Sequence, residues 1–433
     1  MFGFLLLVIY KAVLDAALWW AILPVYGGEV FLDYGGLNII RVCVGYLMLI
    51  PLWLALRLVG SADSNRVSRL VLMVQVLFIA VPTLSLFSQS ERPVQDIGLI
   101  MLGFVLVAVF LCVMPRIRVP VPGRLFFSFL VILAVLLFVY VFGGLVVGGG
   151  LSRLNFNFYN VYEVRESYNE SRLPLFGYFV SWVAYVINMG FLIFFFVKRK
   201  YVGIFAVLLA QVLIFGMTNF KTFLFLPFVI LSVLWIVGRF NFERIVLFGA
   251  SAVVVVLTVI GFSGEAMGFG IARRLFFVPS ALHTLYFDYF SMNPLALMSG
   301  SGIGRLLNAP YEQSAVFVIA DEFWGREFSP NVGWLGAAYA NFGVLGVVLF
   351  SLLLAVYLKV ADSIAGRLPV LGIAEALFIG PAITLCSSAF NTFLLTHGGI
   401  LVLIALWVLA GALVVRPEWA SISKQKQEAS DHE

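Results

Sequence analysis

Long apolar stretches joined by short polar connections dominate this chain and constrain its fold more than any motif does. Only 11% of the 433 residues are charged and 62% are hydrophobic, whereas a soluble domain carries about 25% charged residues. So few charges cannot cover a water-soluble surface. Backbone groups inside a bilayer must satisfy one another, and no alternating barrel pattern occurs. The sequence therefore predicts an all-α polytopic membrane protein.

The apolar stretches predict about twelve transmembrane helices, each close to the length that crosses a bilayer. Their expected ranges are 4–23, 39–56, 70–87, 97–114, 125–142, 175–197, 201–217, 223–237, 245–262, 335–358, 370–386 and 400–415. We expect one transmembrane domain over residues 1–415 and a polar cytoplasmic tail over residues 416–433. Two long outer connections, residues 143–174 and 263–334, are expected to form a periplasmic cap with short amphipathic helices.

The distribution of positive charge predicts the orientation, because cytoplasmic connections are rich in Lys and Arg. Basic residues cluster in alternate connections, for example at 57–69, 116–124 and 198–200, and again in the tail. Both termini are therefore expected in the cytoplasm. The clusters at 198–200 and at Arg239 must be separated by an even number of crossings. Two short helices on either side of residues 218–222 meet this requirement, and one long helix does not.

The basic residues expected on the outer face are nearly all arginine. They are Arg92, Arg153, Arg165, Arg172, Lys221, Arg273, Arg274, Arg305 and Arg326. A guanidinium group binds phosphate oxygens in a fork, whereas Lys acts as a point charge. This composition favours a phosphate or pyrophosphate ligand at the membrane surface. The alternative is that each arginine pairs with a nearby acidic residue such as Glu166 or Glu322.

In the first long connection, a helix over residues 158–170 would place Tyr162, Arg165 and Asn169 on one face. Such a face could stack on sugar rings and hold an anion. The alternative is an aromatic belt at the membrane interface.

In the second long connection, Arg273 and Arg274 precede a stretch that predicts an amphipathic helix over residues 280–291, lying in the outer membrane interface. Its polar face carries His283 and Asp288, the two candidates for a general base. His283 ranks first because a neutral imidazole is available at neutral pH. The alternative is that this face is the solvated side of the helix.

Two charged residues lie deep in the first predicted span. Lys11 and Asp15 are four residues apart and can pair along one helix face, which lowers the cost of placing them in lipid. We interpret them as a structural pair, with a transport role as the alternative. The chain has no Asp-x-Asp pair, phosphate-binding glycine loop or Cys/His spacing typical of a metal site, so neither a metal nor another cofactor is predicted.

Two segments resemble the Wzy-type O-antigen polymerases, which join oligosaccharide repeat units in bacterial inner membranes. The segments are RRLFFVPSALHTLYFDYFS at residues 273–291 and NVGWLGAAYANFGVLG at residues 331–346. The resemblance implies an undecaprenyl-pyrophosphate-linked oligosaccharide substrate, functional periplasmic arginines and no metal. The resemblance implies chain-length regulator and flippase proteins as partners, and it implies no nucleic-acid partner. The family's Arg-x10-Gly pattern is absent, which leaves the choice among the arginines open.

These observations predict a glycosyltransferase that works on the periplasmic face. A sugar hydroxyl would attack a glycan whose leaving group is a lipid pyrophosphate, with arginines stabilising that group and a base taking the proton. The candidate catalytic residues are His283 and Asp288. The candidate substrate-binding residues are Arg165, Arg273, Arg274, Arg305, Arg326, Tyr162, Tyr286 and Asn331. The alternatives are an O-antigen ligase, which shares the donor, and a lipid-linked oligosaccharide flippase or another transporter.

Overall fold

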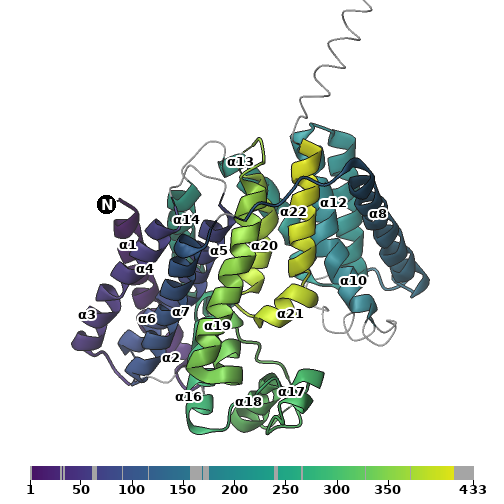
Figure 1. Cartoon of the computed structure of the whole chain (residues 1–433). Coiled ribbons are helices and arrows are strands. Elements are labelled where there is room, and N and C mark those ends of the chain that lie inside the picture. Colours follow the sequence, from purple (N-terminus) through teal and green to yellow (C-terminus); the bar gives the residue numbers. More distant parts are fainter. Residues whose placement is uncertain are drawn as a thin grey trace, which may run out of the picture. The chain divides into compact units, whose positions relative to one another are not determined.

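The computed structural model is built from helices, and no strand occurs in the part of the chain that it describes (Figure 1). That part comprises residues 2–29, 32, 35–60, 66–89, 91–115, 117–156, 168, 175–237, 242–264, 267–326, 328–370 and 372–413. The side chains of residues 2 and 242–244 are not described either. Tyr162, Arg165, Arg172 and the tail 416–433 lie outside these residues.

Nine helices within the described residues are long and apolar enough to span a bilayer. Three shorter apolar helices accompany them, namely Lys221–Val237, Ile373–Thr384 and Gly399–Leu413. Each of the twelve predicted segments coincides with one of these helices. The all-α, multi-pass membrane class is therefore confirmed, while the number of crossings stays a prediction.

The described chain forms two compact units. Unit 1 comprises residues 1–116, 239–359 and 378–395, and unit 2 comprises residues 117–238, 360–377 and 396–433. The helices of unit 1 are α1 (Phe2–Ala17), η1 (Leu18–Ile22), α2 (Leu23–Tyr26), α3 (Ile39–Leu47), α4 (Leu49–Leu58), α5 (Val67–Gln75), η2 (Val76–Ala80), α6 (Val81–Gln89), α7 (Val94–Val113), α14 (Phe242–Phe262), α15 (Met267–Ala272), η4 (Arg273–Phe277), α16 (Val278–Met292), α17 (Gly302–Leu306), α18 (Ala315–Trp324) and α21 (Phe390–Leu395).

Unit 2 is formed by α8 (Arg124–Val147), α10 (Phe176–Trp182), η3 (Val183–Ile187), α11 (Asn188–Val197), α12 (Tyr201–Thr218), α13 (Lys221–Val237) and α22 (Gly399–Leu413). The long helix α19 (Trp334–Ala365) and the helix α20 (Ile373–Thr384) each contribute residues to both units. The break between α12 and α13 confirms the prediction of two short helices around residues 218–222. Asn219 ends α12 in a left-handed conformation, with φ 54°.

Within unit 1, three predicted outer connections contact one another. Arg273 pairs with Glu29, and Asp288 pairs with Arg92, which joins the connections after α2, after α6 and after α14. Two helix ends on the predicted inner side are also in contact, because the Lys359 ammonium donates to the Leu111 carbonyl at 2.8 Å. Helix ends that the charge pattern assigns to the same side of the membrane therefore contact one another. Which end faces the cytoplasm stays a prediction.

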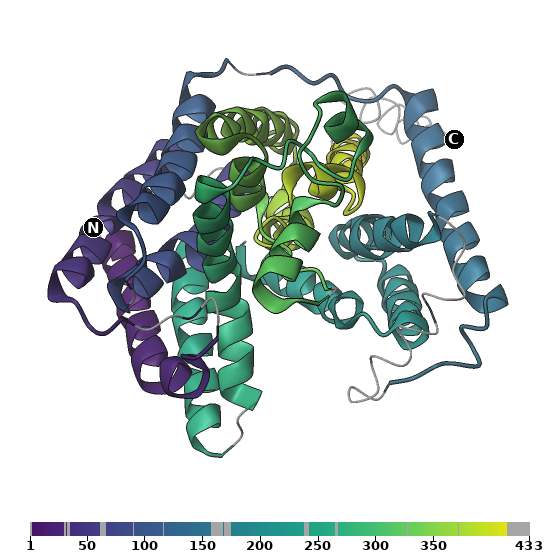
Figure 2. The ribbon, with the colours of Figure 1, turned by 90° about the horizontal axis from the view of Figure 1, so that it is seen from below.

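The outer connection of unit 1 begins with a hairpin, in which α15 folds back against α14 (Figure 2). The segments α15, η4 and α16 then form one continuous helix from Met267 to Met292. α17 and α18 follow, and they lie at the lower end of α19 in Figure 1. We call residues 293–333, which include both helices, the cap segment.

The predicted span 335–358 contains a break that hydropathy did not predict. Gly343 has φ 59° and ψ −146°, a conformation open essentially to glycine alone, so the helical path of α19 is interrupted there. The interruption leaves carbonyl groups of the preceding turn without helical partners. The cap segment supplies partners, because Ala296 N–H donates to Ala340 O at 2.8 Å and Leu297 N–H donates to Asn341 O at 3.3 Å. Met298 N–H donates to the Asn341 side chain at 2.7 Å.

The expected orientation leads to a labelling prediction. In a variant that lacks the three native cysteines, a cysteine placed at the exposed position Asn308 should react with a membrane-impermeant thiol reagent added to intact cells. A cysteine at Asn157 should react as well, and one at Asn65 should react only after the cells are opened. Labelling of the Asn65 variant in intact cells would reverse the orientation and with it the side of the candidate site.

Candidate functional site at the end of helix α16

From Ser280 to Phe287, helix α16 is buried on both of its faces, so the prediction of an interfacial helix with a solvated polar face is wrong for this part of the helix. On the face expected to be wet, Ser280 is 0% and His283 and Thr284 are each 1% exposed. The helix contacts η2 and α6, and His283 approaches the start of α19. Burial is tolerated because the polar side chains bond to their own helix: Ser280 donates to Phe277 O at 2.9 Å and Thr284 donates to Ala281 O at 2.8 Å.

The His283 ring is held against the beginning of α19. Its Nδ1 lies 2.7 Å from the carbonyl oxygen of Pro279, a contact in which Nδ1 carries the hydrogen. A Cβ atom on Gly333 would lie 2.9 Å from His283 Cε1 and 2.7 Å from the Cys386 carbonyl, so only glycine permits this approach. Burial lowers the pKa of His283 to about 4. The ring is therefore a neutral group enclosed by protein, away from the surface where a substrate would arrive.

Asp288 lies at the accessible end of the same helix. Its side chain is 35% exposed, and its Oδ2 accepts a hydrogen bond from Arg92 Nη1 at 3.0 Å. The Arg92 side chain is 10% exposed. Burial raises the pKa of Asp288, and the Arg92 guanidinium opposes the rise. Of the two predicted base candidates, Asp288 is the one that a substrate can reach.

A second carboxylate, Asp96, accompanies this ion pair. Asp96 is in the first turn of α7 and is 3% exposed. Its Oδ2 is buried and has no hydrogen-bond partner among the described residues. It interacts electrostatically with both Asp288 and Arg92. Tyr339 of α19 lies in range of both carboxylates. The three charged groups come from two separate parts of the sequence, Arg92 and Asp96 from one and Asp288 from the other.

Sequence reasoning placed Arg92 among the outer arginines but assigned it no role, and it missed Asp96. The signal was an arginine and an aspartate four residues apart in a short connection, with the aspartate just inside an apolar helix. Nothing local indicated that Asp288, nearly two hundred residues later, completes the group.

The predicted pyrophosphate arginines occupy different surroundings. Arg273 donates to both carboxylate oxygens of Glu29, with Nη2 2.7 Å from each, and its guanidinium lies 4.6 Å from the centre of the Tyr26 ring. Arg274 and Arg305 are exposed, and neither side chain has a hydrogen bond or ion pair among the described residues. Arg326 is also exposed, with its guanidinium 5.2 Å from the centre of the Phe328 ring.

Arg274 and Asp288 are too far apart along their helix to act on one bond. A helix rises about 1.5 Å per residue, so the separation of fourteen positions spans roughly 20 Å. The structure thus brings Asp288 together with Arg92, and it does not bring the carboxylate together with Arg273 or Arg274.

Tyr286 and Asn331 lie near each other at the return into α19. Tyr286 is 0% exposed, and its hydroxyl donates to the Pro330 carbonyl at 2.9 Å. Burial raises the pKa of this hydroxyl. Asn331 is exposed. The geometry therefore makes Tyr286 a fixed link between α16 and the cap segment, and it leaves Asn331 accessible to a ligand.

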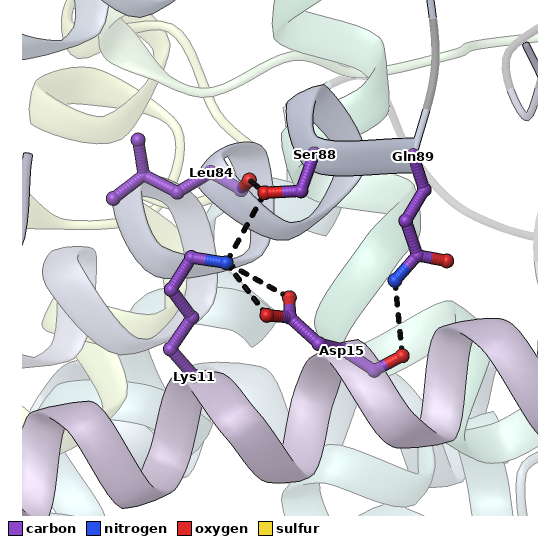
Figure 3. Close-up of polar contacts among 5 residues, drawn as sticks. All are labelled: Lys11, Asp15, Leu84, Ser88 and Gln89. Carbon is purple, nitrogen blue, oxygen red and sulfur yellow. Dashed lines mark hydrogen bonds and ion pairs between the residues drawn. The ribbon is translucent and has the colours of Figure 1, made fainter. Parts of the chain in front are cut away.

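The deep charges of α1 form an internally satisfied group (Figure 3). Lys11 Nζ donates to the two carboxylate oxygens of Asp15 at 3.0 and 2.7 Å and to Ser88 Oγ at 3.2 Å. The Gln89 amide donates to the Asp15 backbone carbonyl at 3.0 Å. The ammonium also lies 4.3 Å from the centre of the Tyr46 ring. Lys11 is 0% exposed, and these contacts confirm the predicted pair that faces other helices.

No protein-family model, no curated protein and no solved structure matches this chain. Among the described residues, no three His, Cys, Asp or Glu side chains are grouped as metal ligands would be. The function is therefore inferred from the arrangement of Arg92, Asp96 and Asp288.

Proposed function

We propose that the chain is a glycosyltransferase of a bacterial inner membrane that joins undecaprenyl-pyrophosphate-linked oligosaccharide repeat units into O-antigen or a related surface polysaccharide. Both termini would lie in the cytoplasm and the reaction would take place on the periplasmic face. The observation that carries this proposal is the ion pair between Arg92 and Asp288. Because the two side chains touch, one bound group could contact both the forked guanidinium and the accessible carboxylate.

The reaction requires both of these groups. A pyrophosphate departs with negative charge, which a preorganised guanidinium stabilises. The attacking sugar hydroxyl must lose its proton as the new bond forms, and a carboxylate whose pKa is raised by burial can accept it. We therefore assign the leaving group to Arg92 and the base to Asp288. Arg274 and Arg305 remain accessible cations for the phosphates of a second lipid carrier.

Aromatic rings beside Asp288 offer a surface for sugars. Tyr289 lies 6.2 Å, between ring centres, from Phe323 of α18, and Phe323 lies 6.1 Å from Trp324. The three rings are half-buried, and the carboxylates of Asp321 and Glu322 next to them are exposed. Aromatic faces pack on sugar rings, and carboxylates accept hydrogen bonds from hydroxyl groups. This combination supports an oligosaccharide as the ligand of the cap segment.

The flippase alternative has less support from the contacts. A transporter is expected to place charged groups in a central cavity that its substrate can reach. The deep charges found here, Lys11 and Asp15, are bonded to each other and to α6. A ligase would use the same donor and the same chemistry, so the experiment must separate a ligase from a polymerase.

Deletion of the gene, followed by gel analysis of surface polysaccharide, separates these functions. A polymerase deletion should remove the ladder of long chains and retain core carrying one repeat unit. Loss of even the single unit would instead indicate a ligase or a flippase, and an unchanged ladder would refute the proposal. Complementation with wild-type protein and with Asp288→Asn then ties the result to the site.

A further inference from the structure

We propose that helix α17 of the cap segment lies in the headgroup region of the lipid bilayer, with its apolar side chains against the acyl chains and Arg305 at the lipid phosphates. The partner of this surface is the phospholipid of the membrane that the long helices span. The inference concerns how the cap segment contacts the membrane, and it does not depend on the proposed function.

The first observation is the apolar side of α17. Ile303, Leu306 and Leu307 are 54%, 83% and 45% exposed. They are three and four residues apart, so their side chains adjoin on one side of the helix. A single exposed leucine is ordinary, whereas neighbouring large apolar side chains on a surface that faces water are not, and they mark an interaction surface.

The second observation is the position of the charge. At 100° per residue, Arg305 lies on the side of α17 opposite to the apolar side chains, and it is exposed. A cationic side opposite an apolar one is typical of a helix that lies at a membrane surface. The other helix of the cap segment differs, because α18 exposes the acidic residues Asp321 and Glu322 together with one large apolar side chain, Phe317. Hydrocarbon and a cation therefore occur together on α17 and not on α18.

The third observation is that α17 is fixed close to the junction with α19. A Cβ atom on Gly304 would lie 2.3 Å from the carbonyl oxygen of Met298, so α17 packs directly on that residue. Ser301 Oγ accepts a hydrogen bond from Gly304 N–H at 3.1 Å, which caps the start of α17. Met298 N–H in turn donates to the Asn341 side chain. The depth of α17 in the membrane therefore follows from the depth of Asn341.

Asn341 lies at one edge of the hydrocarbon core. Lys359, eighteen positions later in α19, donates to the Leu111 carbonyl near the end of α7, which marks the other edge because a lysine is rarely placed deep in lipid. A helix rises about 1.5 Å per residue, so the two positions are roughly 27 Å apart, close to the core thickness of about 30 Å. At the edge where α17 lies, apolar side chains reach acyl chains and a guanidinium reaches phosphates.

The test locates α17 relative to the lipid without any turnover. In a full-length variant that lacks the three native cysteines, Leu306→Cys carries a nitroxide label, and the protein is placed in nanodiscs of phosphatidylethanolamine and phosphatidylglycerol. Spin relaxation by oxygen, which concentrates in lipid, is compared with relaxation by a water-soluble nickel chelate. The references are Val256→Cys, at a 54% exposed position of the apolar helix α14, and Glu322→Cys, at an exposed position of α18.

We expect the ratio of oxygen to nickel relaxation at position 306 to lie closer to the ratio at Val256 than to that at Glu322. Arg305→Gln should lower the ratio at position 306, because the guanidinium no longer holds the helix at the phosphates. Arg326→Gln, which removes another exposed arginine of the cap segment, should leave the ratio unchanged.

Three results would contradict the proposal. A ratio at position 306 closer to that at Glu322 would place α17 in water. A label that neither reagent reaches would show that protein covers the surface. An unchanged ratio in Arg305→Gln would remove Arg305 from the phosphates. All three labelled positions are exposed, so the labels should not prevent folding.

Discussion

Replacement of Arg92 by glutamine is expected to slow glycosyl transfer by about 10²- to 10³-fold while the protein still folds. The guanidinium is 10% exposed and 3.0 Å from Asp288, so its contact with a departing pyrophosphate would be largely shielded from water. Such preorganised contacts are the ones that stabilise a transition state most. Turnover is measured with purified enzyme and a lipid-linked oligosaccharide. Arg92→Lys should recover only part of the rate, because an ammonium lacks the fork.

The matched control is Arg57→Gln. Arg57 is exposed in a predicted cytoplasmic connection, and its guanidinium lies 4.7 Å from the centre of the Trp53 ring. This variant loses the same side chain at a position remote from the site, so it should retain wild-type turnover. Equal turnover in Arg92→Gln and Arg57→Gln would remove Arg92 from the reaction and return the pyrophosphate to Arg274 or Arg305.

Replacement of Lys11 by methionine is expected to destabilise the protein by about 3–5 kcal/mol, because removing one partner of a buried ion pair leaves the other charge uncompensated. Asp15 is 18% exposed and receives both short contacts of the ammonium. The double variant Lys11→Met/Asp15→Leu should regain most of the loss. Thermal unfolding of detergent-purified protein gives the order of stability, and Lys200→Met, at an exposed position, is the control for loss of a lysine.

A different pattern would change the interpretation of the deep pair. If Lys11→Met unfolds like the wild type but the cells lose even the core that carries a single repeat unit, the pair takes part in movement of substrate. That result would favour the flippase over the polymerase. Destabilisation with rescue in the double variant would establish the structural role.

Sequence reasoning was most accurate where structure depends on nearby residues. The two helices around Asn219 and the pair Lys11–Asp15 follow from hydropathy, charge and helical spacing, all of which act over a few residues. The break in α19 was missed because Gly343 in an apolar stretch has the same hydropathy signal whether the helix continues or not. Its positive φ becomes visible only in three dimensions.

The candidate site was predicted only in part, for a related reason. Asp288 was identified as a base candidate, and the structure leaves it accessible beside Arg92. The helix over residues 280–291 was predicted to lie in the outer membrane interface with an accessible polar face, because a pattern shows that two faces differ but not what covers each of them. Here Ser280 and Thr284 bond back to their own helix, which allows neighbouring elements to cover that face. Arg92 and Asp96 lie nearly two hundred residues before Asp288, and no local pattern reports that the three come together.

The junction between α19 and residues 296–298 bears on how an enzyme of this kind could change its substrate over evolution. All three of its hydrogen bonds are donated by backbone N–H groups, which every residue except proline possesses. The attachment of the cap segment to the membrane helices therefore depends little on which side chains the segment carries. Residues of the cap segment such as Phe323 or Trp324 can be exchanged for others suited to a new sugar while the anchoring remains. The interruption of the helix at Gly343 thus allows the scaffold to be kept while the residues that recognise the substrate change.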